Sequence, residues 1–144
     1  MAEPNIENAT KEENPRTRRP RIVLGVTGSV AAVKSPQIAA LLSDFAEVKI
    51  VLTSCGTHFW RQAPVYRGGE GWRAFQEVEA MSQTAQREQN ELQAPTKKCP
   101  RDLSSLVFTD ADEWAVWQQM GDPVTHIQLR GWADVLVVAP LSAH

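Results

Sequence analysis

Residues 21–53 read RIVLGVTGSVAAVKSPQIAALLSDFAEVKIVLT, and this stretch predicts the fold. Residues 22–26 are an apolar, β-branched run bounded by Gly and Thr, which is typical of a fully buried strand. Residues 48–53 form a second run of this kind. Between them, Pro36 is placed where a helix start tolerates it, and four apolar residues then share one helical face: Ile38, Leu41, Leu42 and Phe45.

A strand, a helix and a second strand within these residues form a βαβ unit. Its two strands must be parallel, and its crossover is almost always right-handed. The sequence therefore predicts an α/β sandwich.

Composition restricts the class of protein further. The chain has 144 residues, of which 42% are apolar and 22% charged, as expected for one ordinary globular domain. Fifteen basic residues stand against seventeen acidic ones, for a net charge of -2, so we expect no nucleic-acid partner. The isolated thiols of Cys55 and Cys99 predict a cytoplasmic protein without a structural zinc site. No apolar run reaches the roughly 20 residues of a membrane helix, and the N-terminus lacks the apolar stretch of a signal peptide.

Two parts of the chain are predicted to lie outside the regular domain. Residues 1–20 are polar and rich in proline, so we expect a disordered tail before a domain of residues 21–144. Residues 65–105 are interpreted as an insertion that is poorly ordered or loosely docked. A helix within it would have only a thin apolar stripe, made of Val78, Met81, Ala85 and Leu92.

Regular elements are predicted again after the insertion. Thr109 and Asp112 form a candidate capping box, and the helix that follows has Trp114, Trp117 and Met120 on one face before Gly121 ends it. Asp122 and Pro123 are interpreted as the cap and first position of another short helix, and residues 134–139 as the last strand.

Three loops should meet at one edge of the sheet, because ligands bind beyond the carboxyl ends of parallel strands. They contain residues 25–30, 53–56 and 140–143. Gly28 would let a ligand approach the backbone, and the amides of Ser29 and Val30 would open the next helix, where a phosphate is favoured. Neither a Walker loop nor a GxGxxG fingerprint is present, so a purely steric role for the glycine remains open. These patterns indicate a mononucleotide-type binding domain.

His126 is the leading candidate for acid–base chemistry, since only histidine titrates naturally near neutral pH. The alternative is a histidine held by a backbone carbonyl. Cys55 is interpreted as a small buried thiol. Two further groups of residues have two interpretations each. The tryptophans form either the core or a wall against a flavin or bases (Trp114, Trp117 and Trp132). The acids form either a carboxylate cluster or a first helical turn favoured by the helix dipole (Asp110, Asp112 and Glu113).

Several ordered blocks together resemble the phosphopantothenoylcysteine decarboxylases and their plant and fungal halotolerance relatives; these are residues 25–32, 110–114, 121–127, 129–134 and 139–143. The resemblance implies a flavodoxin-like, Rossmann-type three-layer sandwich with a parallel sheet, here incomplete at the C-terminus. It also implies a trimer that binds FMN at the subunit boundary. Such a trimer decarboxylates 4′-phosphopantothenoylcysteine to 4′-phosphopantetheine in coenzyme A biosynthesis.

Site residues follow from the resemblance by position. His126 matches the family's essential histidine, which assists oxidation and decarboxylation of the substrate. The matching cofactor-binding positions lie in three loops: Gly28, Ser29 and Val30 in the first, Thr53 and Ser54 in the second, and Ser142 and Ala143 after the last strand. No metal is implied.

The chain also departs from the family. His144 stands where relatives continue with an Asn-Thr pair, and neither the Pro-Ala-Met-Asn substrate clamp nor the later catalytic cysteine has a counterpart. We therefore expect a fragment whose last strand has an exposed edge. The alternatives to an active decarboxylase are a non-catalytic or regulatory subunit in a mixed trimer with a homologue, as in phosphatase-inhibiting fungal relatives, an inactive truncated form, or a generic nucleotide-binding domain.

Overall fold

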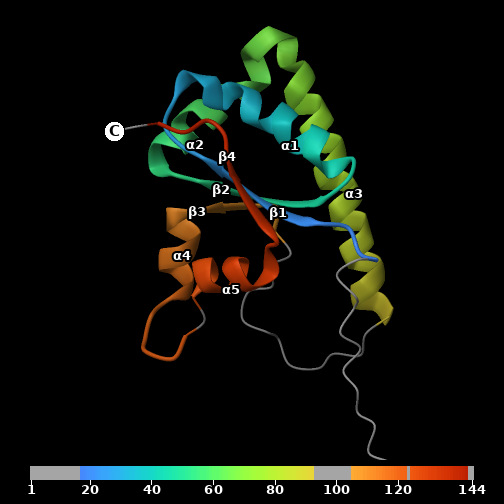
Figure 1. Cartoon of the computed structure of the whole chain (residues 1–144), viewed down its shortest axis with the longest axis vertical. Coiled ribbons are helices and arrows are strands. Elements are labelled where there is room, and N and C mark those ends of the chain that lie inside the picture. Colours follow the sequence, from blue (N-terminus) through green and yellow to red (C-terminus); the bar gives the residue numbers. More distant parts are fainter. Residues whose placement is uncertain (1–16, 93–104, 123, 143–144) are drawn as a thin grey trace, which may run out of the picture.

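Four parallel strands form a single sheet in the order β3-β2-β1-β4 (Figure 1). The computed structural model describes residues 17–92, 105–122 and 124–142. The elements, with η for 3₁₀ helices, are β1 (Arg21–Val26), η1 (Val30–Lys34), α1 (Ser35–Ser43), β2 (Glu47–Leu52), α2 (Ser54–Trp60), η2 (Ala63–Gly69), α3 (Glu70–Leu92), β3 (Val107–Thr109), α4 (Asp110–Val116), α5 (Thr125–Trp132) and β4 (Val135–Val138).

The predicted βαβ unit is confirmed. Strand β1 pairs in parallel with β2 on one side and with β4 on the other, so that Ile22 lies opposite both Val48 and Val135. Strand β1 is central because its apolar residues can be buried on both faces.

Helices cover both faces of the sheet, as expected for a three-layer sandwich. Figure 1 shows α1, α2 and α3 on one side and α4 and α5 on the other. The first side contains the larger core, built from alternate residues of the two central strands: Leu24, Val26, Ile50 and Leu52. The second side has a smaller hydrophobic cluster, whose buried members among the described residues are Val23, Phe108 and Leu129. The helices on the first side therefore bury more apolar side chains against the sheet than those on the second side.

Helix α1 buries only part of the predicted face: Ile38 and Leu42 are half-buried against the larger core, as predicted. Leu41 and Phe45 are 60% and 56% exposed, whereas Pro36 and Ala39 are buried. Helix α1 packs against α3 as well as the sheet. The two helices approach closely at Gly71, where an added Cβ atom would lie 2.9 Å from the Cβ atom of Gln37. Small residues therefore face inward, and the larger ones at 41 and 45 face outward.

The expectation of loose packing after residue 65 is wrong for the described part of that segment. Helix α3 has 23 residues, and its first turns place Trp72 and Phe75 against Trp60 of α2, with ring centroids 5.2–6.0 Å apart. The predicted stripe contributes little, since Met81 is 67% exposed. Residues 93–104 lie outside the described part of the chain, as do residues 1–16 of the predicted tail.

No helix among the described residues is both long enough and apolar enough to cross a membrane.

The region between α4 and α5 corrects three predictions. Helix α4 ends at Val116, so Trp117 does not continue its face, and Trp114 is 74% exposed instead of forming core. Helix α5 begins at Thr125 rather than at Asp122. The Asp122 carboxylate instead accepts hydrogen bonds of 2.9 Å from two backbone N–H groups, those of Gln118 and Gln119. Pro123 lies outside the described residues. Trp132 is half-buried against the smaller core, as predicted.

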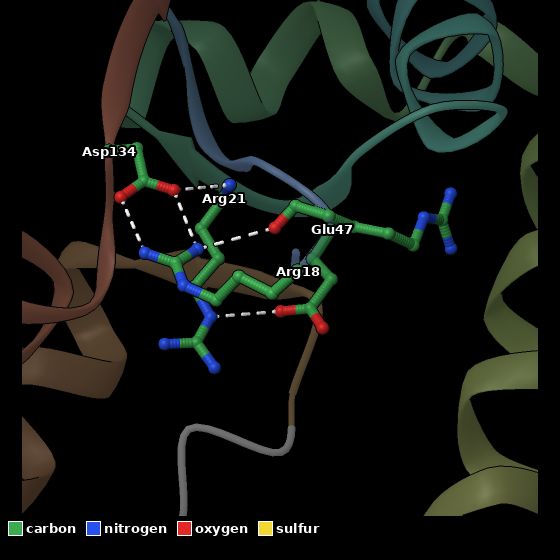
Figure 2. Close-up of polar contacts among 5 residues, drawn as sticks. Arg18, Arg21, Glu47 and Asp134 are labelled. Carbon is green, nitrogen blue, oxygen red and sulfur yellow. Dashed lines mark hydrogen bonds and ion pairs between the residues drawn. The ribbon is translucent and has the colours of Figure 1, made fainter. Parts of the chain in front are cut away.

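An ion-pair network holds the segment before β1 against the start of β4 (Figure 2). The Arg18 guanidinium binds both oxygens of Asp134 at 2.7 Å, and the backbone N–H of Arg21 donates to the same carboxylate at 2.9 Å. The Arg21 side chain binds Glu47 at 3.0 Å. Hydrogen bonds from Arg18, and then from the Arg21 backbone, lower the pKa of Asp134 to about 2.

Replacing Phe75 by alanine tests whether α3 is docked. Phe75 is 2% exposed, and loss of a buried phenylalanine costs about 3–5 kcal/mol of unfolding free energy. Urea titration of Phe75→Ala should show this loss. The control Met81→Ala, on the exposed side of the same helix, should stay within about 0.5 kcal/mol of wild type. Equal effects of the two changes would show that α3 does not pack as described.

Replacing Asp134 by asparagine tests the ion-pair network. Because folding lowers the Asp134 pKa from 3.8 to about 2, its contribution to stability is present above pH 3.8 and is lost as the pH falls toward 2. The unfolding free energy of wild type should therefore fall more steeply over this range than that of Asp134→Asn. Asp44→Asn, which removes an exposed carboxylate, should keep the wild-type slope. An unchanged slope in Asp134→Asn would contradict the role of this network.

Candidate functional site

Three loops meet at the carboxyl edge of the sheet, as the strand pattern predicts. The backbone N–H of Thr53 donates to the carbonyl of Val26 at 3.1 Å. The Thr27 hydroxyl donates to the carbonyl of Pro140 and accepts from the N–H of Ser142, both at 2.7 Å. Thr27 therefore fixes the loop after β4 beside the loop after β1.

The groups displayed at this edge suit an anion. Hydroxyls are present at Ser29, Thr53 and Ser54, and the last two residues are exposed. The Ser29 hydroxyl accepts from the N–H of Ala31 at 3.2 Å, and the Thr53 hydroxyl accepts from the N–H of Gly56 at 3.0 Å, so each begins a helical turn. Residues 27–30, 53–57 and 139–142 include no acidic side chain. Phosphate is the group that such donors favour.

A glycine is required at position 28 because helix α2 approaches the backbone there, whereas the sequence predicts the approach of a ligand. A Cβ atom at this position would lie 2.3 Å from the Cβ atom of Cys55 in α2. The glycine thus leaves room for the second loop. Cys55 is exposed, so the expectation of a buried thiol is wrong; Cys99 lies outside the described residues.

A polar hollow of about 410 Å³ adjoins the second loop. Ser54 lies on its wall, and its hydroxyl donates to Asp110 of α4 at 2.9 Å. The basic side chains of His58 and Arg61 line the same hollow. It therefore offers hydroxyl and basic side chains, together with the Asp110 carboxylate, next to the loop edge.

His126 lies at a second, mainly apolar hollow of about 430 Å³ between the sheet and helices α4 and α5. Its side chain is 69% exposed, and its Nδ1 atom lies 2.5 Å from Oε1 of Glu113. The alternative of a histidine held by a backbone carbonyl is wrong, because the partner is a carboxylate. An exposed imidazole oriented by an acid is suited to proton transfer.

The structure groups the predicted residues into two regions. Gly28, Ser29, Thr53, Ser54 and Ser142 belong to the edge loops. Val30 begins η1 and is exposed, and Ala143 lies outside the described residues. His126 shares its hollow with none of these positions, but Asp110 lines both hollows. Helix α4 therefore separates the histidine from the edge loops.

The three acids of α4 have separate partners instead of forming a cluster. Asp112 accepts from the N–H and the hydroxyl of Thr109, both at 2.8 Å, which confirms the predicted capping box. Asp110 binds Ser54, and Glu113 binds His126. Sequence reasoning missed the last two roles, since no local spacing links these residues. Within the described residues, no group of three or more His, Cys, Asp and Glu could hold a metal ion.

A parallel sheet with an anion-suited loop edge defines a mononucleotide-type α/β binding domain. The Flavoprotein family model matches residues 10–144, and the chain belongs to this family. Family membership supports a flavin as the cofactor.

Among the relatives, phosphopantothenoylcysteine decarboxylase HAL3 of Malus domestica is 36% identical over 143 residues, covering 99% of this chain and 49% of the relative. The Mus musculus phosphopantothenoylcysteine decarboxylase is 33% identical over 129 residues, covering 88% and 45%. The decarboxylase subunit SIS2 of Saccharomyces cerevisiae is 31% identical over 161 residues, covering 93% and 27%. The chain thus spans about half the length of the apple and mouse relatives.

Solved structures agree with the family and the fold. The FMN binding protein AtHal3 has a TM-score of 0.54 and 34% identity, over 88% of this chain and 49% of that one. A PPC decarboxylase mutant complexed with pantothenoylaminoethenethiol has the same TM-score and identity, over 88% and 50%.

Adding a methyl group at Gly28 tests the contact between the first two loops. The collision with Cys55 in Gly28→Ala should cost about 1–3 kcal/mol of unfolding free energy, as overpacking does. Gly131→Ala is the matched control, because an added Cβ atom there meets nothing within 4 Å. The double variant Gly28→Ala/Cys55→Gly should show a favourable coupling of about 0.5–3 kcal/mol. Additive effects would contradict the close approach.

Proposed function

We propose that this chain forms part of an FMN-dependent enzyme that decarboxylates 4′-phosphopantothenoylcysteine to 4′-phosphopantetheine in cytoplasmic coenzyme A biosynthesis. The observation that carries the proposal is the exposed His126, paired with Glu113, in a member of the Flavoprotein family. The names of the apple and mouse relatives supply the substrate, and AtHal3 supplies the cofactor.

The edge loops fit the phosphate of FMN. Its holders would be Gly28, Ser29 and Val30 after β1, Thr53 and Ser54 after β2, and Ser142 and Ala143 after β4. Hydroxyls and backbone N–H groups dominate this set, and the one carboxylate bound to it, that of Asp110, accepts a hydrogen bond from the Ser54 hydroxyl. When bound, the flavin would supply reversible electron transfer at the cysteine part of the substrate.

His126 would hold or move a proton during this chemistry. Its Nε2 atom makes no hydrogen bond to residues 17–92, 105–122 or 124–142, so this nitrogen is available to a substrate group. Its Nδ1 atom is occupied by Glu113. A positioned acid or base of this kind contributes about 10²- to 10⁴-fold to a rate.

The arrangement of the two regions supports a site shared between subunits. His126 is exposed and shares no hollow with the edge loops of its own chain. A flavin held by the loops of one subunit could therefore meet the histidine of another. We propose a homotrimer, or a heterotrimer with a homologue that supplies further site residues. The balanced charge of -2 gives no reason to expect nucleic acid as a partner.

A second candidate is a non-catalytic or regulatory subunit of such a mixed assembly. It is favoured by the similarity to a relative named as a decarboxylase subunit. This candidate differs from the first in one respect: it predicts flavin binding in an assembly whose turnover does not depend on His126 of this chain.

The visible absorption spectrum of the purified chain, alone and co-expressed with a full-length homologue, tests the proposal. We expect a flavin spectrum and release of carbon dioxide from 4′-phosphopantothenoylcysteine by the assembly. His126→Asn should keep the flavin and abolish the turnover that depends on this chain. Retained turnover would favour the regulatory subunit. A colourless protein that binds ADP or ATP would support a generic nucleotide-binding domain, and a colourless, aggregating one an inactive truncated form.

A further inference from the structure

Glu113 makes the one hydrogen bond that the His126 ring forms within the described residues. The two side chains come from different helices, α4 and α5, and lie 13 positions apart in sequence. Their contact, at 2.5 Å between Oε1 and Nδ1, lies at the wall of the 430 Å³ hollow. The carboxylate is 38% exposed and the imidazole 69%, so the pair is open to a ligand on the side of the imidazole.

Both helices that carry the pair, α4 and α5, are held in place by other contacts. The capping box between Thr109 and Asp112 fixes the start of α4 at the end of β3. Asp110, on the same first turn, binds Ser54 of the second edge loop. On the other side, Leu129 is buried against the sheet and fixes α5. The contact thus joins two anchored helices.

A carboxylate beside Nδ1 determines which ring nitrogen of a neutral histidine carries the proton. A carboxylate only accepts hydrogen bonds, so Nδ1 must donate and Nε2 must be the unprotonated nitrogen. A neutral histidine free in solution has its proton mainly on Nε2. In neutral His126, the exposed Nε2 atom can therefore accept a proton only while Glu113 holds the ring in the Nδ1–H tautomer.

We infer that Glu113 is a positioning residue for His126: it holds the ring in the Nδ1–H tautomer and directs Nε2 outward as a proton acceptor. This inference rests on the proposed function for its role in turnover, but not for the tautomer itself. Orienting carboxylates of this kind contribute about 10- to 100-fold where they support metal-bound histidines. We expect Glu113 to contribute a similar factor to the rate that depends on His126.

Nitrogen-15 NMR of the chain labelled at histidine reads the tautomer directly, without flavin or substrate. At about pH 9, where ordinary imidazoles are neutral, His126 should have a protonated Nδ1 and an unprotonated Nε2. The spectrum of His126→Asn identifies its signals among those of three histidines. Glu113→Ala should move the proton mainly to Nε2. Glu113→Gln should keep it on Nδ1, because the amide oxygen accepts the same hydrogen bond.

Two controls separate this effect from a loss of structure. Glu77→Ala removes an exposed carboxylate from α3 and should leave the tautomer unchanged. Glu113→Leu, which retains side-chain volume without an acceptor, gives the same test if the alanine variant unfolds. A proton on Nε2 in wild type, or an unchanged tautomer in both Glu113→Ala and Glu113→Leu, would overturn the inference.

Turnover by the assembly with a full-length homologue provides the functional measurement. Glu113→Ala should lower kcat about 10- to 100-fold with little change in KM or flavin absorbance, and Glu113→Gln should recover most of the rate. An unchanged kcat in Glu113→Ala would overturn the positioning role. If wild type shows no turnover or no flavin, the proposed function fails, whereas the NMR result still decides the tautomer.

Discussion

Pairing of β1 with a strand on each side is the constraint on which the rest of the structure depends. Because β2 and β4 are both parallel to β1, the three loops that follow them leave the sheet at the same edge. The Thr27 hydroxyl then bonds the loop after β4, and Gly28 admits α2. The meeting of the three loops at one edge is thus a consequence of parallel pairing, and short-range contacts complete it.

Helix α4 contacts both candidate regions, the edge loops and His126. Its first turn reaches in two directions, through Asp110 to α2 and through Glu113 to α5. The layer that contains α4 and α5 buries few residues, and much of the adjacent sheet face remains open. A thin layer leaves His126 accessible, whereas the thicker layer on the other face supplies most of the core. The larger core and the His126 side chain therefore lie on opposite sides of the sheet.

Local patterns predicted the elements that depend on local causes. The βαβ unit, the start of α1 near Pro36 and the capping box at Thr109 follow from short-range spacing, and all three are confirmed. The errors arise where the exposure or the partner of a side chain depends on a residue far away in the sequence. Exposure of Leu41 depends on α3, and exposure of Cys55 depends on how α2 packs beside Gly28. The partnership of Glu113 with His126 likewise depends on how α4 and α5 pack, which no spacing in the sequence records.

The distance along the chain between β1 and β4 has a consequence for the order of folding. Ile22 lies opposite Val135, so this edge of the central strand is completed only after more than a hundred further residues have been synthesised. At about 5–20 residues per second, translation leaves that edge of β1 unpaired for on the order of ten seconds. The contact between Arg18 and Asp134 spans 116 positions and can form only at the end of this interval. In a nascent chain this edge of β1 is therefore open to pairing with other chains until β4 emerges.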